Sequence, residues 1–175
     1  MLPSPRPKIE LMASESFDLR PVDAIGVATE GQPGERRFFL QVVGDGKAVT
    51  LACEKFHIQG LVTRIQQLLE ARTGSAEVGP VKTPAEALQA DWEVAEIGLG
   101  FNESKSLFVI VAREAVTDGD AATARFWIDE RQLRGLAKQA EQVLSAGRPL
   151  CQFCGLPVDP GGHPCPAANG SRPIL

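Results

Sequence analysis

The sequence contains no long run of apolar residues. No segment approaches the roughly 20 consecutive apolar residues that a helix needs to cross a bilayer, and the first residues, MLPSPRPKIELMASES, lack the apolar core of a signal peptide. The composition, 43% hydrophobic and 23% charged, is that of a globular protein. We therefore expect a soluble cytoplasmic protein without membrane contact, which begins with a mobile extension over residues 1–15.

An excess of positive charge is also missing, because 18 basic residues stand against 22 acidic ones and the net charge is -4. Proteins that bind nucleic acid through its phosphates usually carry a basic domain or stripe. The one basic helical face consists of Arg131, Arg134 and Lys138, with Glu130 and Glu141 among them. This face is typical of a solvated helix, so nucleic-acid binding is unsupported.

No recognisable catalytic motif is present. The glycine-rich run GQPGERRFFLQ at residues 31–41 lacks the Gly-Lys-Ser/Thr of a phosphate loop, and it leads into a predicted strand rather than a helix. It indicates a hairpin turn, although Arg36 and Arg37 remain candidate contacts for an anion. The acidic residues show no catalytic spacing, so we predict no acid–base pair and no catalytic residue.

What the sequence does contain is an apolar pattern that recurs after 75 residues. Apolar residues follow the i, i+3, i+4, i+7 spacing of an amphipathic helix after Lys55 and again after Glu130. The matching positions are Ile58, Leu61, Val62, Ile65, Leu68 and Leu69, followed by Leu133, Leu136, Ala137, Ala140, Val143 and Leu144. Gly60 and Gly135 match at the same offset. The recurrence predicts an internal duplication.

Three predicted strands precede each predicted helix. They cover 23–28, 37–43 and 49–54, then 92–99, 106–112 and 124–129, with turn residues between them. Short connections favour antiparallel pairing, and Glu54 and Asp129 stand where a carboxylate can cap the following helix.

We therefore predict an α+β domain over residues 16–147. Two pseudo-repeated β-β-β-α units, about 16–75 and 91–147, would form an antiparallel sheet packed by two helices, with a linker over 76–90.

The duplication also guides the interpretation of single residues. Cys53 corresponds to Ile128, so it is interpreted as a small buried hydrophobe rather than a reactive thiol. His57 corresponds to Gln132 and is interpreted as a surface or capping histidine rather than a general base.

Trp127 faces away from its apolar neighbours on the last predicted strand, beside Arg125. A large aromatic side chain on that face packs inside the molecule, or it lines a binding surface or an oligomer contact. Arg125 is a third candidate anion contact.

The segment CQFCGLPVDPGGHPC, residues 151–165, holds three of the four cysteines and one of the two histidines. Its candidate ligands are Cys151 and Cys154, spaced C-x2-C as in a zinc knuckle, and His163 and Cys165, spaced H-x-C. Three thiolates and one imidazole suit a closed tetrahedral site of the structural zinc type.

Other interpretations of this segment stay open. Iron can replace zinc, a C-x-x-C pair can be redox-active, and cysteines can form a disulfide, although a cytoplasmic location argues against this. Asp159 offers an oxygen ligand in place of His163. We favour zinc and predict a small metal-binding, zinc-knuckle-like tail over residues 148–175.

Several runs of the chain together resemble an uncharacterised bacterial family, mainly actinobacterial, catalogued as domain of unknown function 3090. The runs are GQPGERRFFLQV, IGLGFNE and AGRPLCQFCGLPVDPGGHPCPAANG. The resemblance extends from about Phe17 to Gly170, and C-x-x-C-G followed by D-P-x-G-H-x-C-P and A-N-G is its most specific part. It implies that the tail is a unit of this family, and it assigns no chemistry to any residue.

These features suggest three functions. We favour a non-catalytic binding or adaptor protein with a protein partner, in which the zinc-stapled tail is a rigid contact element. The alternative is an enzyme or small-ligand protein for an anionic, phosphorylated metabolite, contacted by Arg36, Arg37 and Arg125. A third function is RNA binding through the knuckle and an exposed Trp127.

Overall fold

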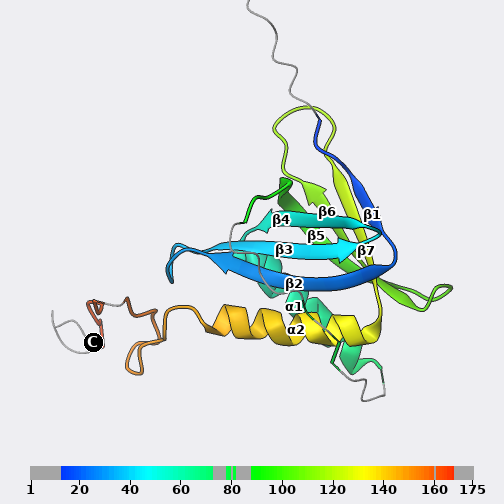
Figure 1. The fold of residues 1–175 in the computed structure, drawn as a ribbon. Coiled ribbons are helices and arrows are strands. Elements are labelled where there is room, and N and C mark those ends of the chain that lie inside the picture. Colours follow the sequence, from blue (N-terminus) through cyan, green and yellow to red (C-terminus); the bar gives the residue numbers. More distant parts are fainter. Residues whose placement is uncertain (1–12, 73–77, 80, 82–87, 160, 168–175) are drawn as a thin grey trace, which may run out of the picture.

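Buried side chains recur at every second position in the strands at 17–19, 107–114 and 123–128, as expected for a sheet with one covered face, whereas residues 38–42 are all buried. In the computed structural model, which describes residues 13–72, 78–79, 81, 88–159 and 161–167, the strands form a single sheet of seven (Figure 1). They are β1 (Phe17–Leu19), β2 (Val22–Glu30), β3 (Arg37–Gly44), β4 (Lys47–Cys53), β5 (Trp92–Asn102), β6 (Leu107–Glu114) and β7 (Thr123–Ile128).

Two helices complete the fold. Helix α1 (Lys55–Glu70) follows β4, and helix α2 (Glu130–Ser145) follows β7. Both helices contribute side chains to one buried cluster with the strands, so they cover the same face of the sheet. The α+β class is confirmed. Neither helix of the described chain is long and apolar enough to cross a membrane.

The sheet is mixed, with the strand order β1-β7-β6-β5-β4-β3-β2. The four hairpin pairs are antiparallel, whereas β4 pairs in parallel with β5 and β1 in parallel with β7. The prediction of an antiparallel sheet is wrong at these two places. The chain between β4 and β5 contains α1, and this long crossover is what a parallel pair requires. Strand β1 was not predicted.

The two halves have the same order of elements, β2-β3-β4-α1 and β5-β6-β7-α2. Phe38 pairs with Cys53 across β3 and β4, as Phe108 pairs with Ile128 across β6 and β7. A register shift lies near the start of both β2 and β5. The duplication itself stays a prediction.

Each helix packs mainly on a strand of the other half. Helix α1 lies on β5, α2 lies on β2, and the two helices contact each other. Helix α2 also satisfies polar groups of β2, since Val27 N donates to Gln139 Oε1 (2.8 Å) and Gln132 Nε2 donates to Val22 O (2.6 Å). These contacts protect an edge strand that would otherwise present unpaired backbone groups.

Side chains cap the starts of both helices. At α2, Gln132 N donates to Asp129 Oδ1 (2.8 Å) and Asp129 N donates to Gln132 Oε1 (3.0 Å), which is a capping box. At α1, Glu54 N donates to His57 Nδ1 (3.0 Å). The predicted cap at Asp129 is confirmed, and at α1 the histidine takes part as well.

The ends of the predicted segments are partly described. Glu15, at the end of the predicted extension, accepts hydrogen bonds from Trp92 Nε1 (3.0 Å) and Lys47 Nζ (2.6 Å). In the predicted linker, Gly79 N donates to Arg131 O (2.7 Å). The remainder of the extension, 1–12, and much of the linker lie outside the described residues.

The close approach of the linker to α2 can be tested at Gly135. A Cβ atom at this position would lie 2.6 Å from Gly79 O, so Gly135→Ala is expected to lower the free energy of unfolding by about 1–3 kcal/mol. The matched control is Gly60→Ala in α1, where a Cβ atom meets nothing within 4 Å. It should raise stability by about 0.5–1 kcal/mol. Urea unfolding followed by circular dichroism measures both, and equal stabilisation by the two changes would contradict the packing.

Candidate metal centre

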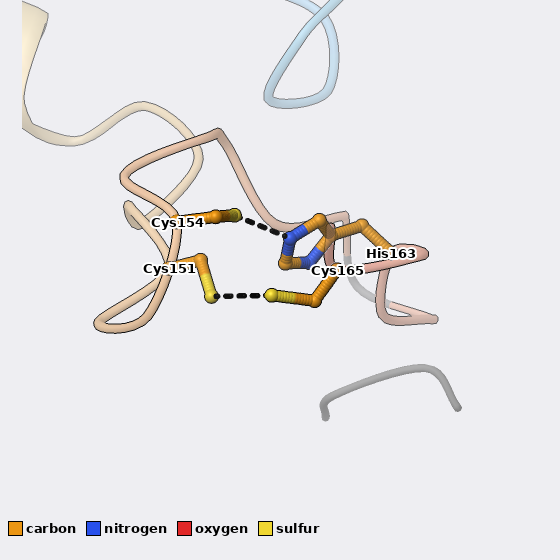
Figure 2. A group of neighbouring side chains, drawn as sticks. All are labelled: Cys151, Cys154, His163 and Cys165. Carbon is orange, nitrogen blue, oxygen red and sulfur yellow. Dashed lines mark hydrogen bonds between the residues drawn. The ribbon is translucent and has the colours of Figure 1, made fainter. Parts of the chain in front are cut away.

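The tail after α2 begins with a tight turn that carries two of the four candidate ligands. Gly155 N donates to Cys151 O (2.8 Å), and Cys151 N donates to Leu156 O (2.8 Å). Gly155 has φ +73°, a conformation that a residue without Cβ adopts at little cost. The turn directs the side chains of Cys151 and Cys154 to the same side (Figure 2).

A second turn returns the chain toward the first. Gly162, with φ +90°, donates its backbone N–H to Asp159 O (2.8 Å). His163 and Cys165 follow, and Figure 2 shows their side chains facing the two cysteines of the first turn. Proline and glycine residues thus fold the segment back, as the sequence suggested.

The four ligand atoms lie within 4.8 Å of one another. Cys151 Sγ is 3.8 Å from Cys165 Sγ, and Cys154 Sγ is 3.2 Å from His163 Nε2 (Figure 2). Zinc bonds to sulfur and nitrogen imply separations of about 3.4–3.8 Å between ligands in a tetrahedral site. The group therefore could hold one metal ion. The four cysteines of the chain are free thiols, not disulfides.

Burial of the ligands also fits a metal centre. Cys151, His163 and Cys165 are buried, and Cys154 is half-buried. His163 Nε2 faces the thiols, whereas His163 Nδ1 is buried without a hydrogen-bond partner among the described residues. A neutral imidazole that ligates through Nε2 carries its proton on Nδ1.

Backbone amides favour the ligand form of Cys151. The N–H groups of Cys154 and Phe153 lower the pKa of the Cys151 thiol from its ordinary value, and Phe153 N lies 3.4 Å from Cys151 Sγ. The thiolate is the form that binds metal, so these amides favour ligation by Cys151, whereas the pKa of the adjacent Cys154 thiol is raised, with burial as the largest raising cause.

Asp159, the alternative oxygen ligand, lies outside this group. Its carboxylate accepts a hydrogen bond from Arg148 Nη1 (2.7 Å) instead. This ion pair connects the ligand segment to the first residue of the tail.

The structure also places the residues that suggested catalysis. Cys53 is buried, as expected, and burial raises the pKa of its thiol to about 12. His57 is buried as well, so the surface interpretation is wrong, while the capping interpretation is confirmed. Its Nδ1 accepts from Glu54 and its Nε2 lies 3.0 Å from Ala95 O, so both nitrogens are occupied.

Two of the three candidate arginines lie close together. Arg36 and Arg37 line one small cavity, and Arg36 Nη1 also donates to Val143 O (3.1 Å) near the end of α2. The guanidinium of Arg37 lies 5.4 Å from the Phe39 ring. Arg125 pairs with Asp18 at 3.9 Å, on strands at the other end of the sheet order. Anion binding by these residues stays a prediction.

Trp127 is half-buried and forms contacts within the protein. Its Nε1 donates to Asp18 Oδ1 (2.8 Å), and the cationic groups of Arg20 and Lys105 each lie 5.9 Å from its ring. The indole N–H is therefore satisfied without a partner molecule.

Sequence reasoning missed Lys55 and Arg148, which line a cavity together with Arg36. One indication was available for Lys55, which opens α1 at a position where acidic residues are usual. Arg148 carries no such indication, because its neighbours in space come from distant segments.

A family model described as "Protein of unknown function (DUF3090)" matches residues 17–165, a range that ends on the fourth ligand. The chain belongs to the DUF3090 family. The resemblance found in the sequence is thus confirmed, and it covers both the body and the ligand group of this DUF3090 protein. No curated protein and no solved structure matches the chain significantly.

Cysteine reactivity in the DUF3090 protein should separate the two kinds of thiol. After removal of metal by a chelator, iodoacetamide near pH 8 is expected to label the three cysteines of the tail. Cys53 should react only in denaturant, because it is buried and its pKa of about 12 leaves little thiolate. Peptide mass mapping over time provides the measurement. Labelling of Cys53 in the native protein at the rate of the tail cysteines would contradict this assignment.

Proposed function

We propose that this protein is a non-catalytic binding protein whose tail, residues 148–175, is a contact element held in shape by zinc. The closed ligand set supports this proposal. Three thiolates and one imidazole would fill all four positions of a tetrahedral ion and leave none for water or substrate. Sulfur and nitrogen ligands suit zinc, with iron as the alternative.

The described part of the tail has no hydrophobic core apart from its ligands. Among the described residues from 148 to 167, the buried ones are Cys151, His163 and Cys165, and all three belong to the ligand group. Folding this segment therefore requires free energy that side-chain packing does not supply. Metal binding can supply it, since ligation and folding are coupled in small modules of this kind.

Apolar side chains of the tail point outward instead. Leu150, Phe153 and Leu156 are 69%, 60% and 49% exposed, although they lie within seven residues of one another in the chain. Exposed apolar residues on a rigid support are typical of protein contact sites, where a few aromatic or aliphatic anchors contribute most of the affinity. We therefore favour a protein partner.

The body is proposed to be a duplicated scaffold that carries this element. Matching element order, matching strand registers and the 75-residue offset between α1 and α2 support the duplication. The free thiols support a reducing compartment, and we propose the cytoplasm.

The metal proposal is tested by elemental analysis of protein purified with reductant and without chelator. About one equivalent of zinc is expected, and Cys154→Ser should reduce it below about half. Cys53→Ser, which changes a thiol outside the ligand group, should leave it unchanged. The unfolding of the body should be nearly unaffected by Cys154→Ser, while proteolysis within the tail becomes faster. Wild-type protein with less than half an equivalent of zinc or iron would refute the metal site. Loss of the whole fold in Cys154→Ser would refute the independence of body and tail.

The contact proposal is tested by affinity purification from native extract with quantitative mass spectrometry. Phe153→Ser should abolish recovery of any protein enriched by the wild type, because it removes the central apolar side chain of the tail. Val116→Ser is the control, since Val116 is 42% exposed on the loop after β6. Zinc content is measured in both variants to verify that the metal site is intact. Equal recovery by wild type and Phe153→Ser would contradict the proposal, as would the absence of any enriched protein.

A further inference from the structure

A cavity of about 320 Å³ lies where the tail meets the body. Its walls come from the β2–β3 turn and β3, from the start of α1, and from the segment after α2 (Figure 1). The lining residues are Gly34, Arg36, Phe38, Glu54, Lys55, Gly147, Arg148, Leu150 and Pro157. The volume is at the lower end of the range for small-molecule sites.

The charge of the lining is predominantly positive. Three basic side chains, those of Arg36, Lys55 and Arg148, stand against the single acid Glu54. Neither Arg36 nor Lys55 forms an ion pair with a carboxylate of the described chain. Arg36 donates one N–H to Val143 O, and the other N–H groups of its guanidinium remain available.

Two glycines make room for the two guanidinium groups. A Cβ atom at Gly34 would lie 3.0 Å from Arg148 Nε, and one at Gly147 would lie 3.1 Å from a terminal nitrogen of Arg36. Arg148 is further held by Asp159 at 2.7 Å. Both arginines are thus placed by contacts rather than extended into solvent, and both are half-buried.

The start of α1 forms one wall of this cavity. Its first turn begins with Lys55 and contains no acidic residue, although the N-cap residue is the acid Glu54. The N–H groups of a helix start carry partial positive charge, and Glu54 offsets part of it here.

We propose that this cavity binds a small phosphorylated molecule. Its phosphate would be held by Arg36, Lys55 and Arg148, because guanidinium groups donate to phosphate oxygens in a planar, charge-assisted geometry. The less polar part of the molecule would lie against the remaining walls, formed by Phe38, Leu150 and Pro157. A phosphate ester carries about two negative charges near pH 7. Against it stand three basic side chains and the acid Glu54, with Arg148 also paired to Asp159 outside the lining.

The metal centre and this cavity share the tail. Leu150 and Pro157 face each other as an antiparallel bridge beside the first ligand turn, and hydrogen bonds of the adjacent residues hold this bridge. Asp159 holds Arg148. Loss of the folded tail would remove one wall and release one arginine. The coupling between metal binding and phosphate affinity rests on the proposed zinc site. The proposal that the wild-type protein binds phosphate does not rest on it.

The experiment is calorimetric titration of the full-length protein with glycerol 3-phosphate and inorganic phosphate at low ionic strength, with citrate and glycerol as comparison ligands. Glycerol 3-phosphate is expected to bind more tightly than citrate, and glycerol should not bind. Lys55→Gln and Arg148→Gln should each weaken binding about tenfold, the loss typical of one charge-assisted hydrogen bond. Arg37→Gln, which removes the same charge next to Arg36 but outside this cavity, should change affinity less than about twofold.

Three results would overturn the proposal. They are the absence of binding of both phosphate compounds, equal weakening by Arg37→Gln, and citrate binding as tight as that of glycerol 3-phosphate. Melting temperatures of all variants separate loss of a contact from loss of the fold. Cys154→Ser, with its zinc content measured, tests the coupling. Unchanged phosphate affinity in zinc-free protein would refute the coupling between the metal site and the cavity, but not phosphate binding itself. Low zinc content in the wild type would refute the metal site, but not phosphate binding.

Discussion

The exchange of helices between the two halves is the constraint on which the rest of the structure depends. In the sheet, the halves meet through β4 and β5, at the pairs Leu51 with Trp92 and Ala52 with Glu93, and through the short strand β1, which pairs with β7. Most of the connection is therefore made on the helical face, where α1 lies on β5 and α2 on β2. Because α2 lies along β2, its end reaches the β2–β3 turn. This contact brings Arg148 to Gly34 and creates the cavity beside the tail.

Body and tail are stabilised by different means. The body buries a continuous set of aliphatic and aromatic side chains between the sheet and two helices, and this supplies its hydrophobic free energy. In the tail, the buried positions are occupied by the sulfur and imidazole groups of the ligands, while Phe153 faces solvent. The proposed metal site would make the stability of the tail depend on metal and redox conditions that leave the body unaffected.

Local patterns predicted the local structure well. Apolar spacing located both helices, alternation located six strands, and C-x2-C with H-x-C located all four members of the ligand group. Long-range relations were not available from these patterns. The parallel pairing of β4 with β5 depends on how a crossover packs, and β1 is too short at three residues to show a period. The cavity was missed for the same reason, since Gly34, Lys55 and Arg148 are brought together only by the exchange of helices.

The exchanged helices also bear on how such a chain could arise. A single β-β-β-α unit of this geometry would leave its helix without a strand to cover, because the strand on which that helix packs belongs to the other unit. Two identical copies related by a twofold axis could each offer a strand on which the helix of the other copy packs. The proposed duplication would thus give the chain the architecture of a symmetric dimer whose subunits have been fused.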